Sequence, residues 1–319
     1  MKTPEKLSVI IPIFNESGII DTLYARLVAA VTKITDNYEF VFVNDGSKDN
    51  SINEIKAIAS QDEQVFFIDF SRNFGHQIAV SAGLKNVTGD SIVIIDGDLQ
   101  DPPELIPELY KAYKSGFDVV YAKRKKRDGE TWLKKTTSKW FYRTLSNITN
   151  FDIPLDTGDF RLISKKVVDA LNTMPEQNKF IRAQIAWLGF KDTSVEFDRD
   201  SRKIGVTGYS YSRLIKMALD GITGFSDKPL LFVSRLGLII SLLSFAIILY
   251  ALIAYFFFNQ QVTGWTSLIV STMFIGGIQL ISVGVIGEYI ARINTDVKKR
   301  PLYIVNETNI ASAEVLDAN

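Results

Sequence analysis

Two carboxylates stand one residue apart in this chain, directly after a short apolar run. They are Asp96 and Asp98, in the sequence Ile-Ile-Asp-Gly-Asp-Leu-Gln-Asp-Pro-Pro of residues 94–103. The β-branched run 91–95 is typical of a central strand of a parallel sheet, and open α/β sheets bind ligands at the edge where such strands end. Ions that bridge diphosphates take oxygen ligands and only one or two protein carboxylates. We therefore predict that Asp98 is a direct ligand of Mg²⁺ or Mn²⁺ and that Asp96 lies close to the ribose or to the same ion.

Polar side chains also end two other predicted strands. Asn15 and Glu16 close the first strand, and an Asp-Gly-Ser sequence at residues 45–47 follows the second. Taken singly, each of these residues is also typical of an Asx turn or a helix N-cap. Three strand ends with acidic or amide side chains are more than turns alone require, so we predict one shared polar crevice.

The elements that must position these side chains alternate along the first 125 residues. Strands are expected at residues 7–14, 38–44, 65–70, 91–95 and 117–122, and helices at 19–34, 51–59, 77–86 and 104–114. This alternation predicts an α/β fold with a doubly wound, mainly parallel sheet and right-handed crossovers. Two short helices and a strand near residues 194–197 are expected to follow.

Two long runs near the C-terminus contain no charged side chain. They cover residues 236–258 and 262–287, and each exceeds the roughly 20 apolar residues that a membrane-spanning helix needs. We predict a hairpin of two transmembrane helices; the alternative is a buried helical hairpin in a soluble domain. The basic residues flank the pair, which places both ends in the cytoplasm. These flanking residues are Arg213, Lys216, Lys228, Arg235, Arg292, Lys298, Lys299 and Arg300.

Composition excludes several classes of function. The chain has no cysteine, so neither a disulfide framework nor a thiolate metal site is present. Its 36 basic and 36 acidic residues give no net charge, which argues against a nucleic-acid partner. The first residues lead directly into a strand and lack a signal-peptide pattern, so the soluble part is expected in the cytoplasm.

Two segments before the apolar runs have patterns that suit a membrane surface. Residues 123–128 form a basic run, which is either a solvated surface or a contact for anionic lipid, and an aromatic-rich helical segment follows at 132–148. Residues 209–222 place apolar side chains along one helical face. We expect an interfacial amphipathic helix there, with a core helix of the soluble domain as the alternative.

Five motifs together resemble a known family. They are residues 12–16, 44–49, 72–75 (Arg-Asn-Phe-Gly), 96–103 and 156–161 (Asp-Thr-Gly-Asp-Phe-Arg), followed by the two-helix anchor. The chain resembles the polyprenyl-phosphate glycosyltransferases of inverting glycosyltransferase family 2, from about residue 7 to residue 303. That group includes bactoprenol glucosyltransferases, undecaprenyl-phosphate aminoarabinose transferases and dolichol-phosphate mannose synthases. The resemblance implies a GT-A fold, a nucleotide-sugar donor, a divalent ion and a lipid-phosphate acceptor.

The resemblance also implies roles for particular residues. Asp98 and Asp159 are the implied catalytic residues, with Asp159 beside the transferred sugar, and Asp96 and Asp98 are the implied metal pair. Asp45 corresponds to the residue that contacts the base. In the loop 202–209, Gly208 stands where the family commonly has lysine. The implied nucleotide-sugar site consists of Pro12, Asn15, Glu16, Asp45, Ser47, Asn73, Asp96 and Gly97.

A lipid-phosphate acceptor sets the chemistry that the protein must supply. Such a phosphate is already ionised at neutral pH, so no strong general base is needed, and the protein has to align two anions and neutralise the leaving group. We predict that Arg182, Arg202 and Lys203 hold the acceptor phosphate; ordinary surface salt bridges are the alternative. Asp159 either orients the sugar or is a structural cap paired with Arg161. The single histidine, His76, is interpreted as a surface or helix-start residue.

The predicted organisation has four parts. These are a GT-A domain at 1–208, a juxtamembrane amphipathic helix at 209–229, a transmembrane hairpin at 230–290 and a cytoplasmic tail at 291–319. The expected function is metal-dependent inverting transfer of one sugar, most simply from UDP-glucose, to undecaprenyl phosphate at the cytoplasmic face of the inner membrane. UDP-linked amino sugars, UDP-N-acetylhexosamines and GDP-mannose stay open as donors. A processive polysaccharide synthase and an inactive membrane-anchored scaffold are the alternatives, and a homo-oligomer is expected.

Overall fold

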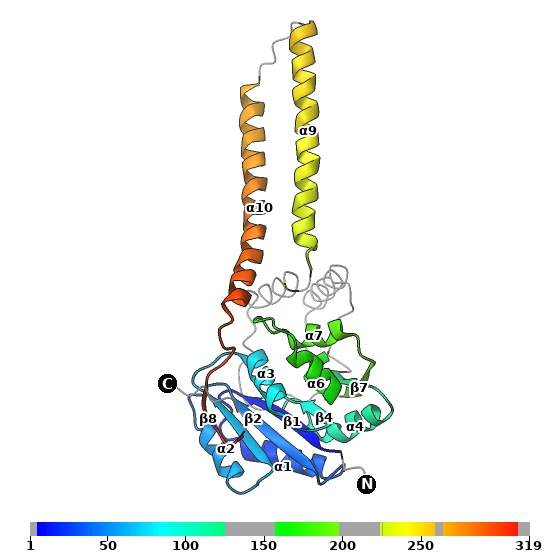
Figure 1. Ribbon diagram of the computed structural model, residues 1–319, viewed down its shortest axis with the longest axis vertical. Helices are drawn as coiled ribbons and strands as arrows, with labels where there is room; N and C mark the ends of the chain where they lie inside the picture. The colour runs from blue at the N-terminus through cyan, green and yellow to red at the C-terminus, as the bar shows by residue number, and fades with distance from the viewer. Residues whose placement is uncertain (1–4, 125–156, 198–223, 225, 259–263, 312–319) are drawn as a thin grey trace. The chain divides into compact units, whose positions relative to one another are not determined.

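The computed structural model describes residues 5–124, 157–197, 224, 226–258 and 264–311 (Figure 1). These residues fall into two compact units. One is an α/β unit of residues 5–124, 157–197 and 299–311, and the other is a helical unit made from the described part of residues 224–298.

One mixed sheet organises the α/β unit. Its eight strands are ordered β7-β5-β6-β4-β1-β2-β3-β8, and pairing is parallel except where β6 joins β4 and β5 and where β8 joins β3. The strands are β1 (Leu7–Ile13), β2 (Tyr38–Asn44), β3 (Val65–Phe70), β4 (Ser91–Ile94), β5 (Val119–Arg124), β6 (Thr157–Ser164), β7 (Asp192–Phe197) and β8 (Val305–Thr308).

Helices cover both faces of this sheet (Figure 1). One apolar core joins alternate β1 side chains to α1, α2 and α4, and a second joins the intervening β-sheet side chains to α3, α6 and α7. The helices are α1 (Ile20–Val31), α2 (Ser51–Ala59), α3 (His76–Asn86), a 3₁₀ turn η1 (Pro103–Leu105), α4 (Ile106–Lys114), α6 (Lys165–Asn172) and α7 (Ile181–Leu188). The three layers explain why every residue of β1 is buried.

The predicted α/β fold is confirmed, and most element bounds agree within two or three residues. One strand was not predicted, since no strand was expected from the sequence between residues 122 and 194. Instead, β6 begins at Thr157 and runs antiparallel between β4 and β5. Its side chains alternate as a strand requires: Phe160 and Leu162 enter one core and Ile163 enters the other.

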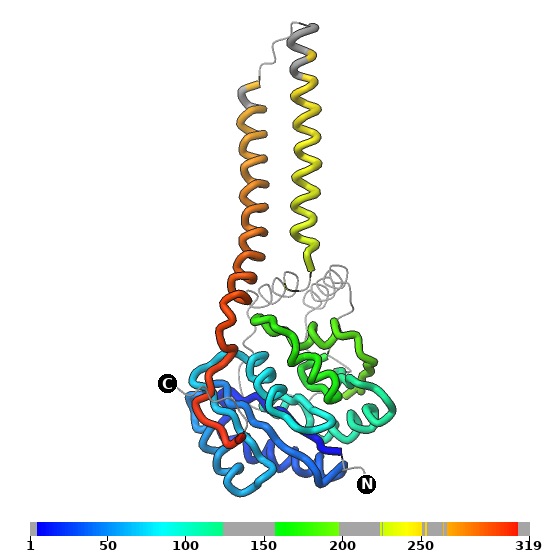
Figure 2. Tube along the Cα trace, viewed as in Figure 1, coloured from blue at the N-terminus to red at the C-terminus, as the bar shows by residue number. Residues whose placement is uncertain are grey.

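The C-terminal segment also differs from expectation. Residues 291–319 were predicted to form a separate tail, but α10 (Trp265–Lys298) extends to Lys298 and β8 then adds a strand to the sheet. Figure 2 shows this segment in red beside the blue strands of the N-terminal half. By pairing with β3, β8 covers a strand that would otherwise expose its backbone groups at the edge of the sheet.

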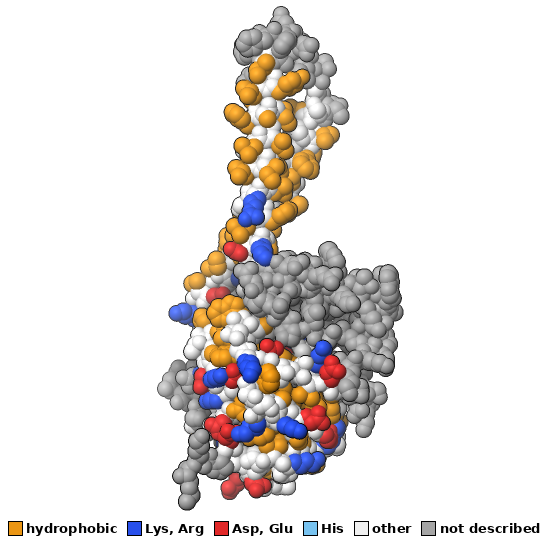
Figure 3. All heavy atoms as spheres, turned by 90° about the vertical axis from the view of Figure 1, so that its right-hand side faces the viewer, with side chains coloured by type: hydrophobic (Ala, Val, Ile, Leu, Met, Phe, Trp, Pro, Cys, Tyr) orange, Lys and Arg blue, Asp and Glu red, His pale blue; other side chains and the backbone are white. Residues whose placement is uncertain are grey.

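The helical unit contains α9 (Lys228–Phe258) and α10. Both are long and apolar enough to cross a membrane, and neither apolar window is buried inside the protein. Figure 3 shows hydrophobic side chains outward along these helices, which argues against the buried-hairpin alternative. The expected helices at 132–148 and 209–222 lie outside the described residues, as does the basic run beyond Arg124.

A buried carboxylate ties together the starts of β1 and β2. Glu39 is 3% exposed and accepts hydrogen bonds from Ser8 Oγ at 2.6 Å, the Thr88 amide at 2.7 Å and the ammonium group of Lys6. Burial alone would raise the pKa of Glu39, but these donors, Lys6 first, outweigh it and lower the pKa. The charged form is therefore the one that the folded state stabilises.

We predict that Glu39→Gln lowers the free energy of unfolding by about 2 kcal/mol at pH 7, because charge-assisted hydrogen bonds become ordinary ones. The wild-type advantage is complete above the ordinary pKa of glutamate and is lost as pH falls through the lowered folded-state pKa. Denaturant unfolding of the detergent-solubilised chain at several pH values measures the loss of unfolding free energy and its dependence on pH. Glu104→Gln is the control, since its pair with Arg26 is exposed and is expected to cost under about 1 kcal/mol. Equal losses in the two variants would contradict the prediction.

Candidate active site

The site lies at the carboxyl edge of three adjacent strands, β4, β1 and β2. The loops that follow these strands carry most of the predicted site residues, at positions 15–16, 45–47 and 96–98. Because neighbouring parallel strands end side by side, the sheet brings together residues that are about 30 to 80 positions apart in sequence. The predicted crevice therefore has a structural basis in the strand order.

Hydrogen bonds lock the first two loops to each other. The Asn15 amide donates to Ser47 Oγ at 2.9 Å, and Asn15 Oδ1 accepts from the Lys48 amide at 2.8 Å. Asn15 has a φ of +56°, a left-handed conformation that asparagine tolerates better than most residues. The Glu16 amide donates to Ser51 Oγ at the start of α2. These contacts fix the backbone of the predicted nucleotide-binding residues before any ligand arrives.

Asp45 holds the loop that precedes α3. Its carboxylate accepts hydrogen bonds from the Asn73 side chain at 2.9 Å and from the Phe74 and Gly75 amides at 2.7 and 3.0 Å. The loop before α3 can approach Asp45 this closely only because residue 46 is glycine. A Cβ atom at Gly46 would lie 2.2 Å from the Arg72 backbone. Asp45 and Asn73, both predicted to touch the nucleotide, thus also bind each other. Their contact with a base stays a prediction.

The Asp-Gly-Asp loop is tightly constrained. A Cβ atom at Gly97 would lie 2.3 Å from the end of the Ile13 side chain and 3.1 Å from the Pro12 carbonyl, so the loop passes close against β1 and a larger residue would require Ile13 to shift. Asp98 Oδ1 accepts a hydrogen bond from the Gln100 amide at 3.1 Å, and Leu99 between them has a φ of +58°. The geometry is that of an Asx turn, the alternative noted from the sequence, and it fixes the direction of the Asp98 side chain.

Strand β6 brings Asp159 to the same edge. In the antiparallel register of β4 and β6, Ile94 pairs with Arg161. Continuing that register by two residues sets Asp96 opposite Asp159. An antiparallel insertion therefore places a carboxylate from late in the chain beside the Asp-Gly-Asp loop.

Three cationic side chains surround Asp159. Arg161 Nη2 and Arg182 Nη2 lie 2.9 and 3.5 Å from Asp159 Oδ1, and His76 Nε2 lies 3.2 Å from Oδ2. His76 Nε2 is also 3.6 Å from Asp96 Oδ1. Arg161 is 1% exposed, with Nε and Nη2 also donating to the carbonyls of Asp159 and Gly158. The pairing of Asp159 with Arg161, left open by the sequence, is present.

The protonation states follow from this arrangement. Burial opposes charge on His76, but its ion pair with Asp159 and the charge of Asp96 raise its pKa to about 9. Burial first, and then the nearby charges of Asp159, Asp101 and Asp98, raise the pKa of Asp96 to about 6 despite His76. Burial also opposes ionisation of Asp159, but His76 and the two arginines hold its pKa well below the usual range. At neutral pH the site therefore holds an ionised Asp159 and a protonated His76.

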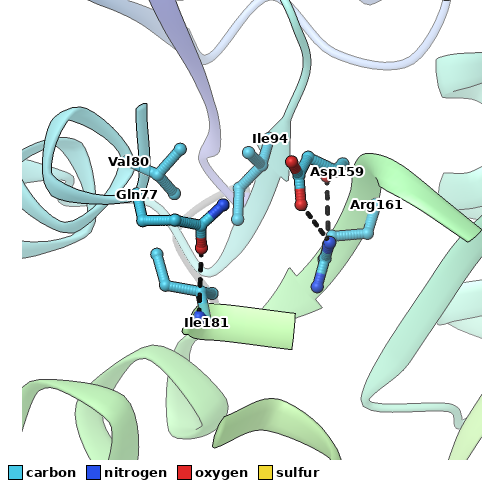
Figure 4. Close-up of a pocket in the computed structure, with 6 residues that line it drawn as sticks. All are labelled: Gln77, Val80, Ile94, Asp159, Arg161 and Ile181. Atoms are coloured by element: carbon cyan, nitrogen blue, oxygen red, sulfur yellow. Dashed lines mark hydrogen bonds and ion pairs between the residues drawn. The ribbon is translucent and has the colours of Figure 1, made fainter. Parts of the chain in front are cut away.

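A small hollow lies behind Asp159 (Figure 4). Asp159 and Arg161 form one side, and Gln77, whose Oε1 accepts the Ile181 amide at 3.1 Å, lies on the other. It has about 160 Å³ of empty volume including its open mouth but no room inside for a water molecule, so it is not a ligand pocket. The residues around the hollow therefore pack behind Asp159 and support it. A nucleotide sugar would instead need the open space above the strand ends.

The side chains present suit a hard divalent cation. Asp96 Oδ1 is buried and accepts no hydrogen bond from the residues that the structure describes. Ligand atoms of His76, Asp96 and Asp159 lie within 4.8 Å of one another. Asp98 is not in that group, although its charge reaches Asp96. Oxygen-rich ligand sets favour Mg²⁺ and Mn²⁺, so the predicted class of ion fits this edge.

Other predicted residues have mixed outcomes. Arg182, assigned to the acceptor phosphate, is near Asp159, while Arg202 and Lys203 lie outside the described residues. His76 does begin α3, as expected, but its ring lies between two carboxylates. One signal for this position is present in the sequence, because His76 directly follows the family-like motif Arg-Asn-Phe-Gly.

Known proteins resemble this chain over almost its whole length. The family model for glycosyl transferase family 2 matches residues 8–171. The uncharacterized glycosyltransferase YkcC of Bacillus subtilis (strain 168) is 48% identical over 94% of this chain and 93% of its own length. The prophage bactoprenol glucosyl transferase homolog of Escherichia coli (strain K12) is 41% identical over 94% of this chain and 98% of its own length.

A solved structure has the same fold at low sequence identity. The mannosyltransferase PcManGT of Pyrobaculum calidifontis, in complex with GDP-Man and Mn²⁺, superposes with a TM-score of 0.51 at 16% identity. The match covers 70% of this chain and 64% of that protein. At this identity the likeness supports the fold alone.

We predict that Asp159→Asn lowers the pKa of His76 from about 9 toward the ordinary value near 6.5, because the variant removes the negative partner of the ring. His76 is the only histidine, so labelled histidine gives one NMR titration curve in metal-free, detergent-solubilised protein. Asp118→Asn, which removes a carboxylate paired with Lys166 instead, is the control and should leave the curve in place. An unchanged His76 pKa in Asp159→Asn would refute the proposed ion pair.

Proposed function

The chain belongs to glycosyl transferase family 2 and is a glycosyltransferase, and from this premise we propose that it transfers one sugar from UDP-glucose to a polyprenyl phosphate. The main support is the full-length similarity to proteins named bactoprenol glucosyl transferase, which extends through both apolar helices. Those helices suggest membrane association, as a lipid acceptor requires. We further propose that the catalytic domain and both termini face the cytoplasm and that the reaction inverts the anomeric centre.

The donor would bind at the strand ends of β1, β2 and β4. In this proposal the loops fixed by Asn15, Ser47 and Asp45 hold the nucleotide, and the Asp-Gly-Asp loop faces the diphosphate. Asp98 and Asp96 would hold Mg²⁺ or Mn²⁺, which supplies positive charge to the leaving diphosphate. Rigid loops reduce the entropy that donor binding would otherwise cost.

The acceptor phosphate needs positive charge rather than a base. A phosphate monoester is already largely ionised at neutral pH, so its attacking oxygen carries no proton that must be removed. The Arg182 side chain is 20% exposed, and its contact with Asp159 is long, at 3.5 Å from Nη2 to Oδ1. Its guanidinium therefore has N–H donors left for a second anion. We propose that Arg182, together with Arg202 and Lys203, binds the phosphate bidentately or as point charges.

Asp159 would then stand beside the sugar as a permanent negative charge. Its contacts with Arg161 and His76 keep it ionised and hold its orientation. A fixed carboxylate can orient a sugar hydroxyl or stabilise positive character at the anomeric carbon. This proposal assigns Asp159 to orientation and electrostatics and not to proton removal.

The donor and acceptor are tested together in membranes that contain the full chain. We expect label from UDP-glucose to enter the lipid extract, to depend on added undecaprenyl phosphate, and to exceed label from UDP-N-acetylhexosamines, UDP-linked amino sugars and GDP-mannose. Membranes without the chain are the control. Label that enters a polymer instead of the lipid extract, or no lipid label from any donor, would refute the proposed function.

The metal role is tested by Asp98→Ala. We expect at least about a hundredfold loss of transfer, because charge on the leaving diphosphate would no longer be compensated. Chelator should inactivate the wild type, with Mg²⁺ or Mn²⁺ restoring it. The control Asp118→Asn should keep near wild-type turnover. Full activity of the wild type in excess chelator would contradict metal dependence.

A further inference from the structure

A chain of polar side chains runs from β8 to the predicted donor loops. It consists of Asn306, Asp69, Asn44, Ser47 and Asn15, and is called the polar chain below. Asn306 lies in β8, Asp69 and Asn44 are paired residues near the ends of β3 and β2, and Asn15 follows β1. The segment after the second apolar helix is thus connected, by side chains, to the loops that are proposed to hold the donor. Figure 2 shows this C-terminal segment beside the N-terminal strands.

Every link in the polar chain is a hydrogen bond of ordinary length. Asn306 Nδ2 donates to Asp69 Oδ2 at 2.8 Å, and Asn44 Nδ2 donates to Asp69 Oδ1 at 2.7 Å. Ser47 Oγ then donates to Asn44 Oδ1 at 2.5 Å, and the Asn15 amide donates to Ser47 Oγ at 2.9 Å. The middle of the polar chain is shielded from water, since Asn44 and Asp69 are 1% and 7% exposed.

Asp69 sets the direction of all the other bonds. An ionised carboxylate only accepts, so Asn306 and Asn44 must both turn their NH₂ groups toward it. Asn44 therefore presents its oxygen to Ser47, whose hydroxyl must donate to that oxygen. The lone pairs of Ser47 are then left to accept the amide of Asn15. If Asn306 did not hold the Asp69 carboxylate in place, the side chains of Asn44 and Ser47 would be free to rotate.

The docking of β8 does not depend on Asn306 alone. Tyr303 stacks on Phe70 with ring centroids 4.8 Å apart, Thr308 Oγ1 donates to the Phe67 carbonyl, and β8 pairs with β3 along its backbone. Asn309 makes two further bonds, accepting the Phe67 amide at 2.8 Å and donating to the Val65 carbonyl at 3.0 Å. Losing the Asn306 side chain should therefore leave the strand in place.

We propose that Asn306 is a positioning residue for the donor site, acting through Asp69, Asn44 and Ser47 on the loop backbone at Asn15. This inference rests on the proposed function in one respect, namely that the loops at residues 14–18 and 44–50 hold the nucleotide. The C-terminal segment is then part of the donor site's support, although no residue of β8 is proposed to touch the donor.

The first test needs no substrate. In hydrogen–deuterium exchange on the full chain in detergent, Asn306→Ala should speed amide exchange about tenfold in peptides that cover residues 14–18 and 44–50. Asn309→Ala is a matched control: it removes the same side chain from the same segment, and its two bonds reach Val65 and Phe67, toward the other end of β3. In this control variant, the rate of amide exchange in the peptides of residues 14–18 and 44–50 should be unchanged.

The second test separates positioning from stability. Asn306→Ala should raise the KM for the nucleotide sugar about tenfold with kcat changed less than about twofold, whereas Asn309→Ala should lower the melting temperature without moving the KM. Asp69→Asn is a second variant with nearly unchanged shape, and it should reproduce the KM rise. The double variant of Asp69→Asn with Asn306→Ala should have a KM little higher than that of either single variant, because both substitutions break the same polar chain.

Several results would overturn the inference. These are unchanged loop exchange in Asn306→Ala, unchanged KM in that variant, or an equal KM rise in Asn309→Ala. Failure of the proposed function is recognised separately, by a wild type that transfers no sugar to undecaprenyl phosphate. In that case the dissociation constants of UDP and GDP, measured with Mn²⁺, replace the KM comparison. The hydrogen–deuterium exchange test is interpreted as before.

Discussion

The repulsion between carboxylates at one sheet edge is the constraint on which the rest of this structure depends. Burial first, and then the nearby charges of Asp159, Asp101 and Asp98, raise the pKa of Asp96. Such a cluster is stable only if positive charge is supplied, and His76, Arg161 and Arg182 supply it around Asp159. The same excess of negative charge near Asp96 makes this edge suitable for a divalent cation with a diphosphate. Structural stability and proposed catalysis thus depend on the same electrostatic balance.

The mixed topology of the sheet creates this balance. A purely parallel sheet would carry the carboxyl ends of its strands to one edge, and the Asp-Gly-Asp loop arrives there in that way. Asp159 arrives differently, because β6 runs antiparallel and presents its beginning at the edge where β4 ends. The reversal also buries Arg161 beside Tyr121 and behind Asp159, where its guanidinium remains charged through its partner. A buried charge of this kind is tolerated only with such a partner.

The loops that are proposed to hold the donor are stabilised by a different set of interactions. Asp45 clamps the loop before α3, and Asn15 and Ser47 clamp the first two loops to each other. Behind them, Asp69 joins β2 to the C-terminal strand. Neutral amides and buried acceptors provide the rigidity here, so that the charged groups of the edge stay available for ligands. The division suits the proposed reaction, which brings two anions together, since rigid loops position what the charges attract.

The amino-acid sequence by itself determined the elements and the chemical character of the site. Strands 38–44 and 65–70, helix 51–59 and both apolar helices were predictable because their patterns are local, and the Asp-Gly-Asp loop was predictable because it directly follows a strand. Only the tertiary structure decided which distant groups meet. His76 and Asp159 are 83 positions apart, and Asn306 is 237 positions from Asp69. Residues 157–161 include turn-forming types, so their extended conformation in β6 depends on pairing with β4 and β5, and β8 likewise needs β3 as a partner. Hydrophobic periodicity records which side of an element is buried, but not which element it is buried against.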